Sequence, residues 1–464
     1  MDPSYSVKPV SLYGGRKAPE VLNIVIVGCG LGGLAAAYCL GQAGHQITVL
    51  EAAPEIGEVG AGIQLGPNFT RLLIRWGLGE KLKEFGVIPL AFRFRRYEDG
   101  RTVGWTKWGE GMEREHGSPY YHIHRADLHR LLLELARPFM SLSTNSRVVS
   151  AEPGVPAVTL ESGAVIQADL IIGADGVKST IREIVVGGPD KPVATGDAAY
   201  RAIIPTAEML QDPVLKHLVD ETEMTGWIGP KKHIIGYCIR GKKEYNLVMA
   251  HPAPATEESY TAEGSTEKMR ADFAGWEPRV QKLMALVPST LIWPLLDRAP
   301  LDTWIHRDGR IILLGDACHP MLPYRAQGSA MAVEDAAVLG NLLSRLTSRG
   351  QLTPLLYAYQ SLRYPRATAT QAAARGNQNI FHLEDGPAQE ARDASMSAAM
   401  DLALREAAGE ALGDSCETAG NSNIWADRQK NRDQFGHDAD EEVERWWARN
   451  HGLVDTPIGV NPRL

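Results

Sequence analysis

Paired cysteines, the mark of many secreted proteins, are missing from this sequence. Among its 464 residues only five are cysteine, and no two of them form a Cys-x-x-Cys pair. A disulfide-rich secreted domain has closely spaced cysteines, so scattered ones indicate reduced thiols. We therefore expect a cytoplasmic protein. The five are Cys29, Cys39, Cys238, Cys318 and Cys416.

Long apolar runs and blocks of positive charge are also missing. No apolar stretch approaches the roughly 20 residues of a membrane span, and the polar residues 1–19 contain no signal-peptide core. The net charge is −8, which argues against general nucleic-acid binding. The sequence predicts no membrane span and no nucleic-acid partner, and we expect no metal ion.

The remaining composition is that of a soluble globular protein, with 44% apolar and 22% charged residues. A chain of this length can form two or three domains around a large core. No internal repeat is visible.

Residues 23–51 carry a complete dinucleotide-binding pattern. The β-branched run 24–27 predicts a buried parallel strand. An apolar helix pattern follows over 31–43, and a second strand pattern covers 46–50. The turn between the first strand and the helix reads Gly-x-Gly-x-x-Gly, formed by Gly28, Gly30 and Gly33.

Each part of this pattern has a physical task. Gly28 permits the tight turn, Gly30 lets a pyrophosphate approach the backbone, and Gly33 lets the helix pack on the strand. The helix N-terminus offers N–H groups and a positive dipole to the phosphates. Glu51 follows the second strand and can accept hydrogen bonds from a ribose. The alternative is an ordinary glycine-rich turn, but the flanking strand, helix and acid favour a nucleotide site.

Two later stretches rich in apolar residues are expected to be buried strands that end at acidic residues. The stretch 168–174 ends at Asp175-Gly176, and the stretch 310–315 ends at Asp316. Ligands of open α/β sheets bind at the carboxyl ends of strands. A helix is predicted from Ser329 to Leu346, with its N-terminus directed at whatever Asp316 helps to hold.

Other segments offer further contacts. The glycine-rich stretch 55–64, which contains Gly62, is expected to be a loop that can lie against a planar ligand. Arg125 stands at the start of a predicted helix and is a candidate phosphate or ribose contact. A surface salt bridge to Asp127 is an equally good interpretation from the local pattern.

The three motifs occur in an order that resembles the FAD-dependent aromatic hydroxylases, single-component flavoprotein monooxygenases of the para-hydroxybenzoate hydroxylase type. The resemblance covers about residues 20–380 and is closest to the fungal salicylate-hydroxylase-like group. It is carried further by residues 58–64 (EVGAGIQ), 122–128 (HIHRADL), 322–335 (LPYRAQGSAMAVED) and 420–427 (GNSNIWAD).

The resemblance implies an α/β fold with a Rossmann-like FAD-binding domain, an inserted β-sheet-rich substrate domain and a C-terminal helical extension. The FAD-binding domain would comprise 20–90, 119–192 and 297–380, the substrate domain 91–118 and 193–296, and the extension 381–464. We expect the extension to be peripheral, with its tryptophans docked on the body of the protein or on a second subunit.

The resemblance also implies roles for single residues. Glu51 would bind the adenosine ribose, Arg125 the cofactor, and Asp316 the ribityl–pyrophosphate segment. Asp175 would serve FAD and a transient NADH or NADPH. The helix after Gly328 would stabilise negative charge on reduced flavin. Ser329 departs from the glycine or alanine common in the family.

The substrate site is expected in the inserted domain. There the resemblance places Arg201 and Tyr237 in the cavity, where Arg201 could stabilise a phenolate or carboxylate. A phenolate would attack a flavin C4a-hydroperoxide. The alternatives are a strand-surface charge for Arg201 and a packed core residue for Tyr237. His319 and His233 are further acid–base candidates.

The leading hypothesis is an FAD- and NAD(P)H-dependent monooxygenase that uses molecular oxygen on a small phenolic compound, with decarboxylation if the substrate resembles salicylate. A tailoring monooxygenase acting on a larger polycyclic or prenylated compound remains open. A two-dinucleotide reductase is disfavoured because no second glycine fingerprint is present. A flavin-bound scaffold without activity is the non-enzymatic alternative, and a homodimer is possible.

Overall fold

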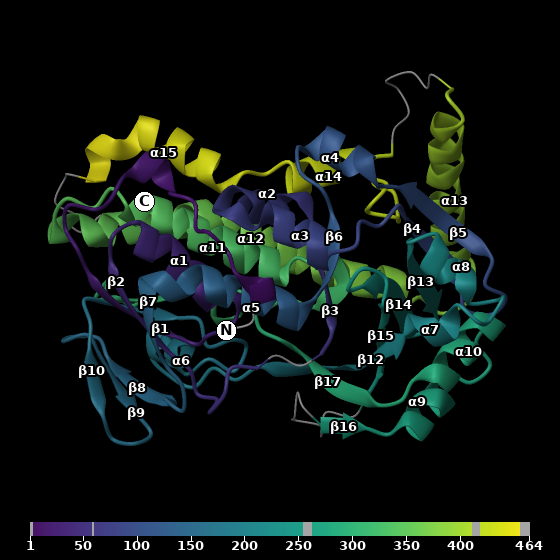
Figure 1. Ribbon diagram of the computed structural model, residues 1–464, viewed down its shortest axis with the longest axis horizontal. Coiled ribbons are helices and arrows are strands. Elements are labelled where there is room, and N and C mark those ends of the chain that lie inside the picture. The colour runs from purple at the N-terminus through teal and green to yellow at the C-terminus, as the bar shows by residue number, and fades with distance from the viewer. Residues whose placement is uncertain (1–2, 58–59, 254–261, 411–417, 455–464) are drawn as a thin grey trace.

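A five-stranded parallel sheet forms the centre of the first domain in the computed structural model, which describes residues 3–57, 60–253, 262–410 and 418–454 (Figure 1). Its strand order is β18-β11-β1-β2-β7, and every neighbouring pair is parallel. The apolar runs of the central strands are buried because helices cover the sheet. The strands are β1 (Asn23–Val27), β2 (Gln46–Leu50), β7 (Met140–Ser143), β11 (Leu170–Gly173) and β18 (Ile311–Leu313).

Helix α1 (Leu31–Gln42) lies between α5 (Arg125–Ala136) and α11 (Gly328–Leu343) and packs against both. Helix α11 is buried from Ala330 to Leu343, as its apolar sequence predicts. Helix α6 (Thr180–Val186) follows β11, and a small antiparallel sheet of β8 (Val148–Glu152), β9 (Ala157–Leu160) and β10 (Val165–Gln167) lies at the edge of the domain.

The second domain is an eight-stranded sheet of order β16-β17-β12-β15-β14-β13-β4-β5, antiparallel except where β13 meets β4. Two separate parts of the chain therefore build one sheet. Its strands are β4 (Ala91–Arg96), β5 (Thr102–Lys107), β12 (Val193–Pro205), β13 (Met224–Gly229), β14 (Lys232–Ile239), β15 (Glu244–Pro252), β16 (Ala262–Gly264) and β17 (Thr290–Asp297).

Alternation along these strands divides the sheet into two faces. On one face, residues such as Tyr200, Trp227 and Leu247 pack under four short helices that the sequence analysis did not predict. These are α7 (Thr206–Met209), α8 (Lys216–Asp220), α9 (Thr266–Asp272) and α10 (Pro278–Leu286). The other face, which carries Arg201 and Tyr237, is turned toward the first domain and lines a cavity.

Several short elements lie between the strands of the two sheets along the chain. Strand β3 (Gly62–Leu65) pairs with β6 (Tyr121–His124). The glycine-rich stretch 55–64 was expected to be a loop throughout; the structure corrects this, because its last residues belong to β3, and residues 58–59 lie outside the described residues. Helix α2 (Pro67–Leu73) then passes into a π-helical turn at Ile74–Leu78, followed by α3 (Gly79–Phe85). Helix α4 (Glu110–His116) precedes β6.

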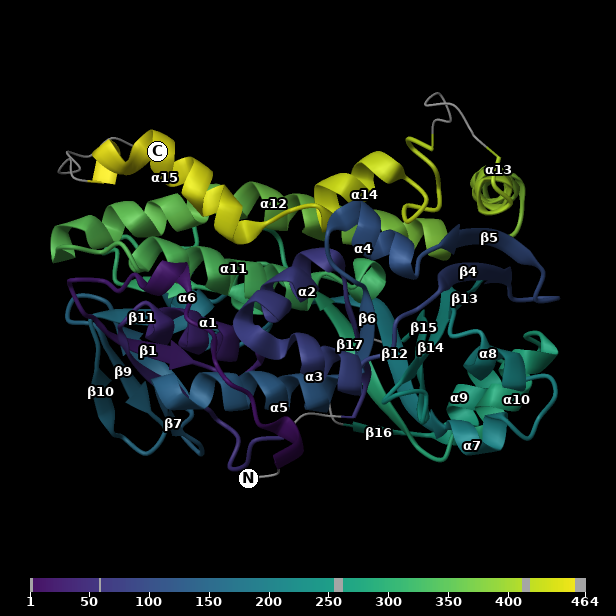
Figure 2. The ribbon, with the colours of Figure 1, turned by 45° about the horizontal axis from the view of Figure 1, so that its top comes forward.

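The C-terminal part of the chain is helical and runs across the top of both domains (Figure 2). The sequence pattern predicts a helix over about residues 352–375, and α12 (Leu352–Phe381) continues beyond that end, with Pro365 inside it. Helix α13 (Pro387–Ala407) packs against β5, α14 (Arg428–Phe435) contacts α2, and α15 (Ala439–Val454) packs against α11 and α12. Within the described residues, no helix combines the length and apolarity that crossing a membrane requires.

Candidate active site

A cavity of about 280 Å³ lies between the two domains. Strands β12, β14, β15 and β17 form one wall, and the N-terminus of α11 with the loop before it forms the other. Eight residues proposed from the sequence line this cavity together: Gly62, Arg125, Arg201, His233, Tyr237, Asp316, Gly328 and Ser329.

The glycine fingerprint adopts the geometry that its sequence predicts. Gly28 has φ +106°, and a Cβ there would lie 2.4 Å from the carbonyl oxygen of Ala174. A Cβ at Gly33 would lie 2.1 Å from the carbonyl oxygen of Gly28, so the helix packs directly on the turn. A Cβ at Gly30, in contrast, would meet no atom within 4 Å. This open space at the N-terminus of α1 fits the pyrophosphate of a dinucleotide.

Glu51 is linked to this turn by a hydrogen bond. Its Oε2 accepts from the backbone N–H of Cys29 at 2.9 Å, and its Oε1 accepts from the N–H of Ala53 at 2.8 Å. Since an ionised carboxylate has about four acceptor positions, two remain for ribose hydroxyls. The residue is half-buried at the carboxyl end of β2.

Asp175 is turned away from the cavity. Its carboxylate accepts hydrogen bonds from the N–H groups of Thr180 and Ile181, at 2.8 and 3.2 Å, and from the Ser179 hydroxyl. It therefore caps the start of α6. The backbone of Asp175 lies beside Gly28, and the neighbouring Val177 lines the cavity. Any contact of this motif with a cofactor is thus expected from its backbone.

Asp316 and Arg125 place opposite charges at the cavity. Asp316 is exposed although every other residue from Ile311 to Pro320 is buried, and its side chain faces the cavity. Arg125 begins α5. Asp127, which the sequence offered as its salt-bridge partner, instead accepts from Tyr5 at 2.8 Å and from Arg240 at 2.9 and 3.1 Å.

The N-terminus of α11 lies at the same cavity. The helix begins at Gly328, and its first turn contains no acidic residue. Its unpaired N–H groups and dipole would favour an anionic ligand there. The open space at Gly30, the exposed Asp316 and this helix N-terminus together fit a bound FAD.

Arg201 and Tyr237 face the cavity from the substrate sheet. The Arg201 guanidinium lies 3.8 Å from the ring centroid of Trp293 on β17, a cation–π contact that fixes the position of the charge. Burial raises the pKa of the Tyr237 hydroxyl, and the nearby Arg201 charge opposes this shift. The tyrosine is therefore neutral at physiological pH, and its ring packs on His122 at 4.2 Å.

His233 also lines the cavity and begins a chain of polar groups. Its Nδ1 is 2.8 Å from Nε2 of His382, and Nδ1 of His382 is 3.6 Å from Asp197. Asp197 also accepts from Tyr324 at 3.1 Å and from Gln378 at 2.6 Å. Burial and the neighbouring His382 lower the pKa of His233. The lowered pKa keeps His233 neutral, so a free ring nitrogen can accept a hydrogen bond from a ligand in the cavity.

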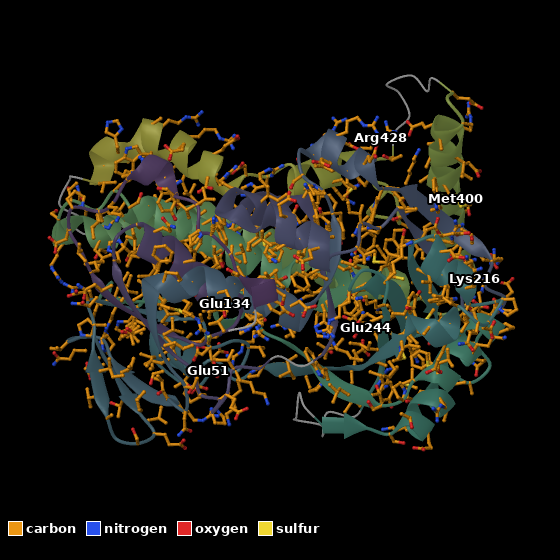
Figure 3. All side chains as sticks on the ribbon, viewed as in Figure 1. Glu51, Glu134, Lys216, Glu244, Met400 and Arg428 are labelled. Carbon is orange, nitrogen blue, oxygen red and sulfur yellow. The ribbon has the colours of Figure 1, made fainter. Side chains whose placement is uncertain are left out.

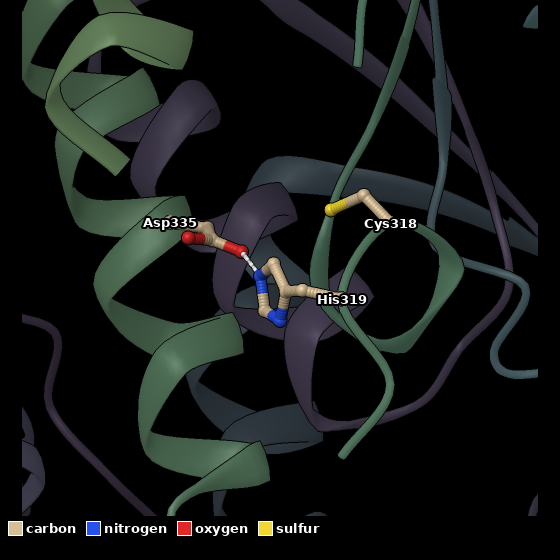
Figure 4. Close-up of side chains that lie close together, drawn as sticks. All are labelled: Cys318, His319 and Asp335. Carbon is tan, nitrogen blue, oxygen red and sulfur yellow. Dashed lines mark hydrogen bonds and ion pairs between the residues drawn. The ribbon is translucent and has the colours of Figure 1, made fainter. Parts of the chain in front are cut away.

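His319 lies outside the cavity, in a buried cluster with Cys318 and Asp335 (Figure 4). Its Nε2 is 2.6 Å from Asp335 Oδ2. Burial opposes its charge, but Cys318 and Asp335 raise the pKa of His319 well above the ordinary value. Asp335 also accepts from Arg363 at 2.8 Å. The guanidinium of Arg363 beside this cluster favours an ion-pair network over a cation-binding site. Through its bond to Asp335, His319 connects the loop after β18 to α11.

Several residues in or behind the cavity wall were not singled out from the sequence. Trp293 lines the cavity and supports Arg201. Asn246, behind the wall, accepts a hydrogen bond from the N–H of Gly62 at 2.7 Å. Trp425 reaches the cavity from the C-terminal extension, which we had expected to be peripheral. Because side chains alternate along a strand, the sequence could have placed Trp293 on the same face of the sheet as Arg201, and Asn246 on the same face as Tyr237. No local pattern indicates where Trp425 docks.

Comparison with known proteins agrees with this geometry. The family described as "FAD binding domain" matches residues 21–374. The chain is 38% identical over 384 residues to the "FAD-dependent monooxygenase OpS4" of Beauveria bassiana (strain ARSEF 2860), covering 82% of this chain and 90% of the relative. The chain is an FAD-dependent monooxygenase of the aromatic hydroxylase family.

Two further similarities extend this assignment. The "3-hydroxybenzoate 6-hydroxylase" of Klebsiella oxytoca is 35% identical over 372 residues, which cover 78% of this chain and 89% of the relative. A solved structure described as "Salicylate hydroxylase substrate complex" has the same fold, with a TM-score of 0.71 and 23% identity over 95% of this chain and 99% of that one. The expected fold class, enzyme class and FAD cofactor of the aromatic hydroxylase are thereby confirmed.

Proposed function

We propose that this aromatic hydroxylase uses NADH or NADPH and molecular oxygen to hydroxylate a small phenolic substrate bound between Arg201 and the N-terminus of α11. The observation that carries the proposal is the position of Arg201. It lies over Trp293 in the same cavity as Asp316 and Gly328. A fixed cation next to the cofactor side of a cavity suits a phenolate or carboxylate substrate.

Each residue of the site would have its own role in binding the cofactor or the substrate. Gly30 and the N-terminus of α1 would bind the pyrophosphate of FAD, Glu51 the adenosine ribose, and Asp316 the ribityl–pyrophosphate segment. When bound, FAD supplies the electron transfer and the oxygen activation. Arg201 would hold the substrate anion, and Tyr237 would offer a neutral hydroxyl to it. His233, held neutral beside His382, would accept a hydrogen bond from the phenolic hydroxyl.

A small substrate is favoured over a polycyclic one. The cavity volume of about 280 Å³ lies just below the usual range for ligand sites, about 300–1,000 Å³. Part of this space would be taken by the flavin, since Arg125 and Asp316 line it as well. The similarity to a 3-hydroxybenzoate hydroxylase supports the same choice.

Decarboxylation would depend on the substrate. With a salicylate-like acid, the phenolate directs oxygen to the ring carbon that bears the carboxylate, and rearomatisation releases carbon dioxide to leave a catechol. With a phenol that lacks this carboxylate, oxygen replaces hydrogen and no carbon dioxide is released. Both outcomes suit the cationic cavity.

A ligand panel tests the proposed function. The purified holoenzyme should oxidise NADH or NADPH slowly alone and faster with its aromatic substrate, and product mass and carbon dioxide identify the reaction. Catechol from salicylate would support the decarboxylating reaction, whereas stimulation by polycyclic phenols alone would favour the tailoring alternative. If FAD-loaded protein responded to no aromatic ligand, the proposal would be wrong.

Replacement of Arg201 tests the substrate site. We expect Arg201→Ala to retain FAD but to lose about 10²-fold in kcat/KM, since one charged contact to the reacting anion is removed. Arg201→Lys is the matched control and should recover part of the loss, because it keeps the charge but not the planar stacking on Trp293. Wild-type kinetics of Arg201→Ala would exclude this residue from the site.

We further propose a cytoplasmic protein that can form a homodimer. The cytoplasmic assignment is supported by the scattered cysteines, four of which are buried and free in the structure. The extension docks on its own chain, where Arg345 lies 4.7 Å from the Trp447 ring. Light scattering of the holoenzyme measures the oligomeric state.

A further inference from the structure

Trp425 stands between the active-site cavity and a second cavity. It lines the active-site cavity of about 280 Å³ and also a cavity of about 400 Å³ on its other side. The second cavity is enclosed by β5, α4, α13 and the described residues 418–431 of the extension. One residue therefore belongs to the walls of both spaces.

The indole is held in this position from two directions. Its ring lies 4.9 Å from Phe92, 5.9 Å from Phe94 and 6.0 Å from Phe381, with the Phe381 ring nearly parallel at 19°. These three residues form a rigid aromatic support, since stacked and edge-on rings attract one another. Only 7% of Trp425 is exposed.

The backbone around the indole is fixed as well. Asn431 donates to the carbonyl of Trp425 at 2.7 Å, and the N–H of Trp425 donates to Asn423 Oδ1 at 3.2 Å. Asn423 in turn donates to Thr106 on β5 at 2.9 Å. The extension is thus tied to the substrate sheet at the residues that flank the tryptophan.

The second cavity has the chemistry to accept part of an aromatic substrate. Its inner wall is apolar, formed by Trp108, Met112 and Ala399, which are buried. Its rim carries the exposed cations Lys107, Arg114 and Arg428 together with Glu115 and Glu406. In Figure 3, Arg428 at the start of α14 lies near α4, and Met400 lies across from it on α13.

We propose that Trp425 is a specificity-determining residue that limits the substrate to the size of the active-site cavity. Replacement by a small residue would join the two cavities, so that a substrate with additional fused rings could extend toward α13. This inference rests on the proposed function for the identity of the reaction, but the position of Trp425 between the cavities does not depend on it.

The test measures how the preference between small and large ligands changes with the side chain at position 425. Holoenzyme of the wild type and of Trp425→Ala is titrated with salicylate, 1-hydroxy-2-naphthoate and 9-phenanthrol, with flavin absorbance changes giving Kd and NAD(P)H oxidation giving turnover. We expect the ratio of Kd for the larger ligands to Kd for salicylate to fall at least tenfold in Trp425→Ala. Trp425→Phe keeps a ring against Phe381 and should give an intermediate ratio, and it serves if the alanine variant does not fold.

Two further variants make the test specific. Trp447→Ala removes another tryptophan of the same extension, one that contacts Arg345 and His451 rather than either cavity, and it should leave the ratio unchanged. Ala403→Trp places a large side chain in the second cavity from α13. In the double variant with Trp425→Ala it should cancel the gain for the larger ligands.

The outcomes separate this inference from the proposed function. An unchanged ratio in Trp425→Ala, or a gain that Ala403→Trp does not cancel, would overturn the role of Trp425 even in an active enzyme. If no aromatic ligand bound to or stimulated any variant, the proposed function would be wrong. Crystal structures of the wild-type and Trp425→Ala holoenzymes would then decide: one continuous cavity supports the inference, and collapse of residues 423–428 into the space contradicts it.

Discussion

His45 is a buried histidine that joins two ends of the first domain. Its Nδ1 accepts from the N–H of Leu22, just before β1, and its Nε2 donates to the carbonyl of Leu343 at the end of α11, both at 3.2 Å. Only 5% of the residue is exposed. Burial lowers its pKa to about 4. The neutral ring is required, because a protonated Nδ1 could not accept the first bond.

This geometry predicts acid sensitivity. Above pH 6.5 His45 is neutral in both the folded and unfolded states, so its contribution is complete. Between pH 6.5 and about 4 only the unfolded chain binds the proton, and the free energy of unfolding falls by about 1.4 kcal/mol per pH unit from this residue. We expect His45→Gln, which can make both hydrogen bonds, to reduce that slope in urea titrations at pH 4.5–7. An unchanged slope would assign the acid sensitivity to other groups.

Gly30 allows the FAD site to be tested without disturbing the fold. A side chain at this position meets no protein atom within 4 Å, so Gly30→Val should fold with near wild-type Tm yet push the pyrophosphate away. We expect colourless, folded protein, measured by flavin absorbance and circular dichroism. Gly188→Val is the control, because its surroundings are equally open. Full flavin content in Gly30→Val would count against the assigned site.

At the scale of elements, helix α15 is attached to the rest of the protein by charged residues near its start. Asp438 accepts two hydrogen bonds from Arg75, at 3.0 and 2.6 Å, and Arg366 donates to the carbonyl of Gln434. Burial opposes the charge of Asp438, but Arg75 lowers its pKa overall. These contacts fasten the end of the extension to the π-helical turn after α2 and to α12.

Loss of this attachment should loosen the end of the chain. Asp438→Asn weakens a charge-assisted pair whose arginine is partly exposed, so we expect a loss of about 1 kcal/mol. Limited proteolysis should then cut α15 sooner while FAD content stays unchanged. Glu441→Gln on the first turn of the same helix is the control. Equal cleavage rates in both variants would show that Asp438 does not fasten the helix.

Elements with strong local patterns were predictable from the sequence, and those set by distant contacts were not. The strands at residues 24–27 and 46–50 and the helix between them follow from apolar spacing and glycine positions. Strand β3 was missed because its pairing partner, β6, lies more than fifty residues away. The short helices under the substrate sheet and the extension of α12 to Phe381 were missed because their ends depend on tertiary packing.

At the scale of the whole molecule, the candidate site is assembled from parts that no single segment reveals. The motifs around Gly28, Asp316 and Gly328 indicated the cofactor side, because nucleotide sites require glycine and acid at set places. The position of Trp425 could not be predicted, since its ring contacts come from Phe92 on β4 and Phe381 on α12. The domain boundaries and the roles of Glu51 and Asp175 stay predictions.

One helix contacts both domains. In α12, Arg363 binds Asp335 of α11 at 2.8 Å, Gln371 donates to the carbonyl of Arg298 at 2.9 Å, and Phe381 lines the substrate cavity. Arg363 and Phe381 are separated by roughly 27 Å of helix axis at 1.5 Å per residue. We expect the amides of this stretch to exchange with deuterium as one protected unit, and mass spectrometry can check this. Faster exchange of residues 371–381 alone would contradict it.

The continuity of α12 also restricts how the enzyme can move. A rotation of one domain relative to the other would have to bend this helix or break the buried ion pairs of Arg363, and both are costly. The mechanical stiffness of α12 therefore leaves little room for a hinge between the domains. Entry of substrate and release of product would then depend on small displacements of loops at the rim of the cavity, such as residues 320–327, around a rigid frame.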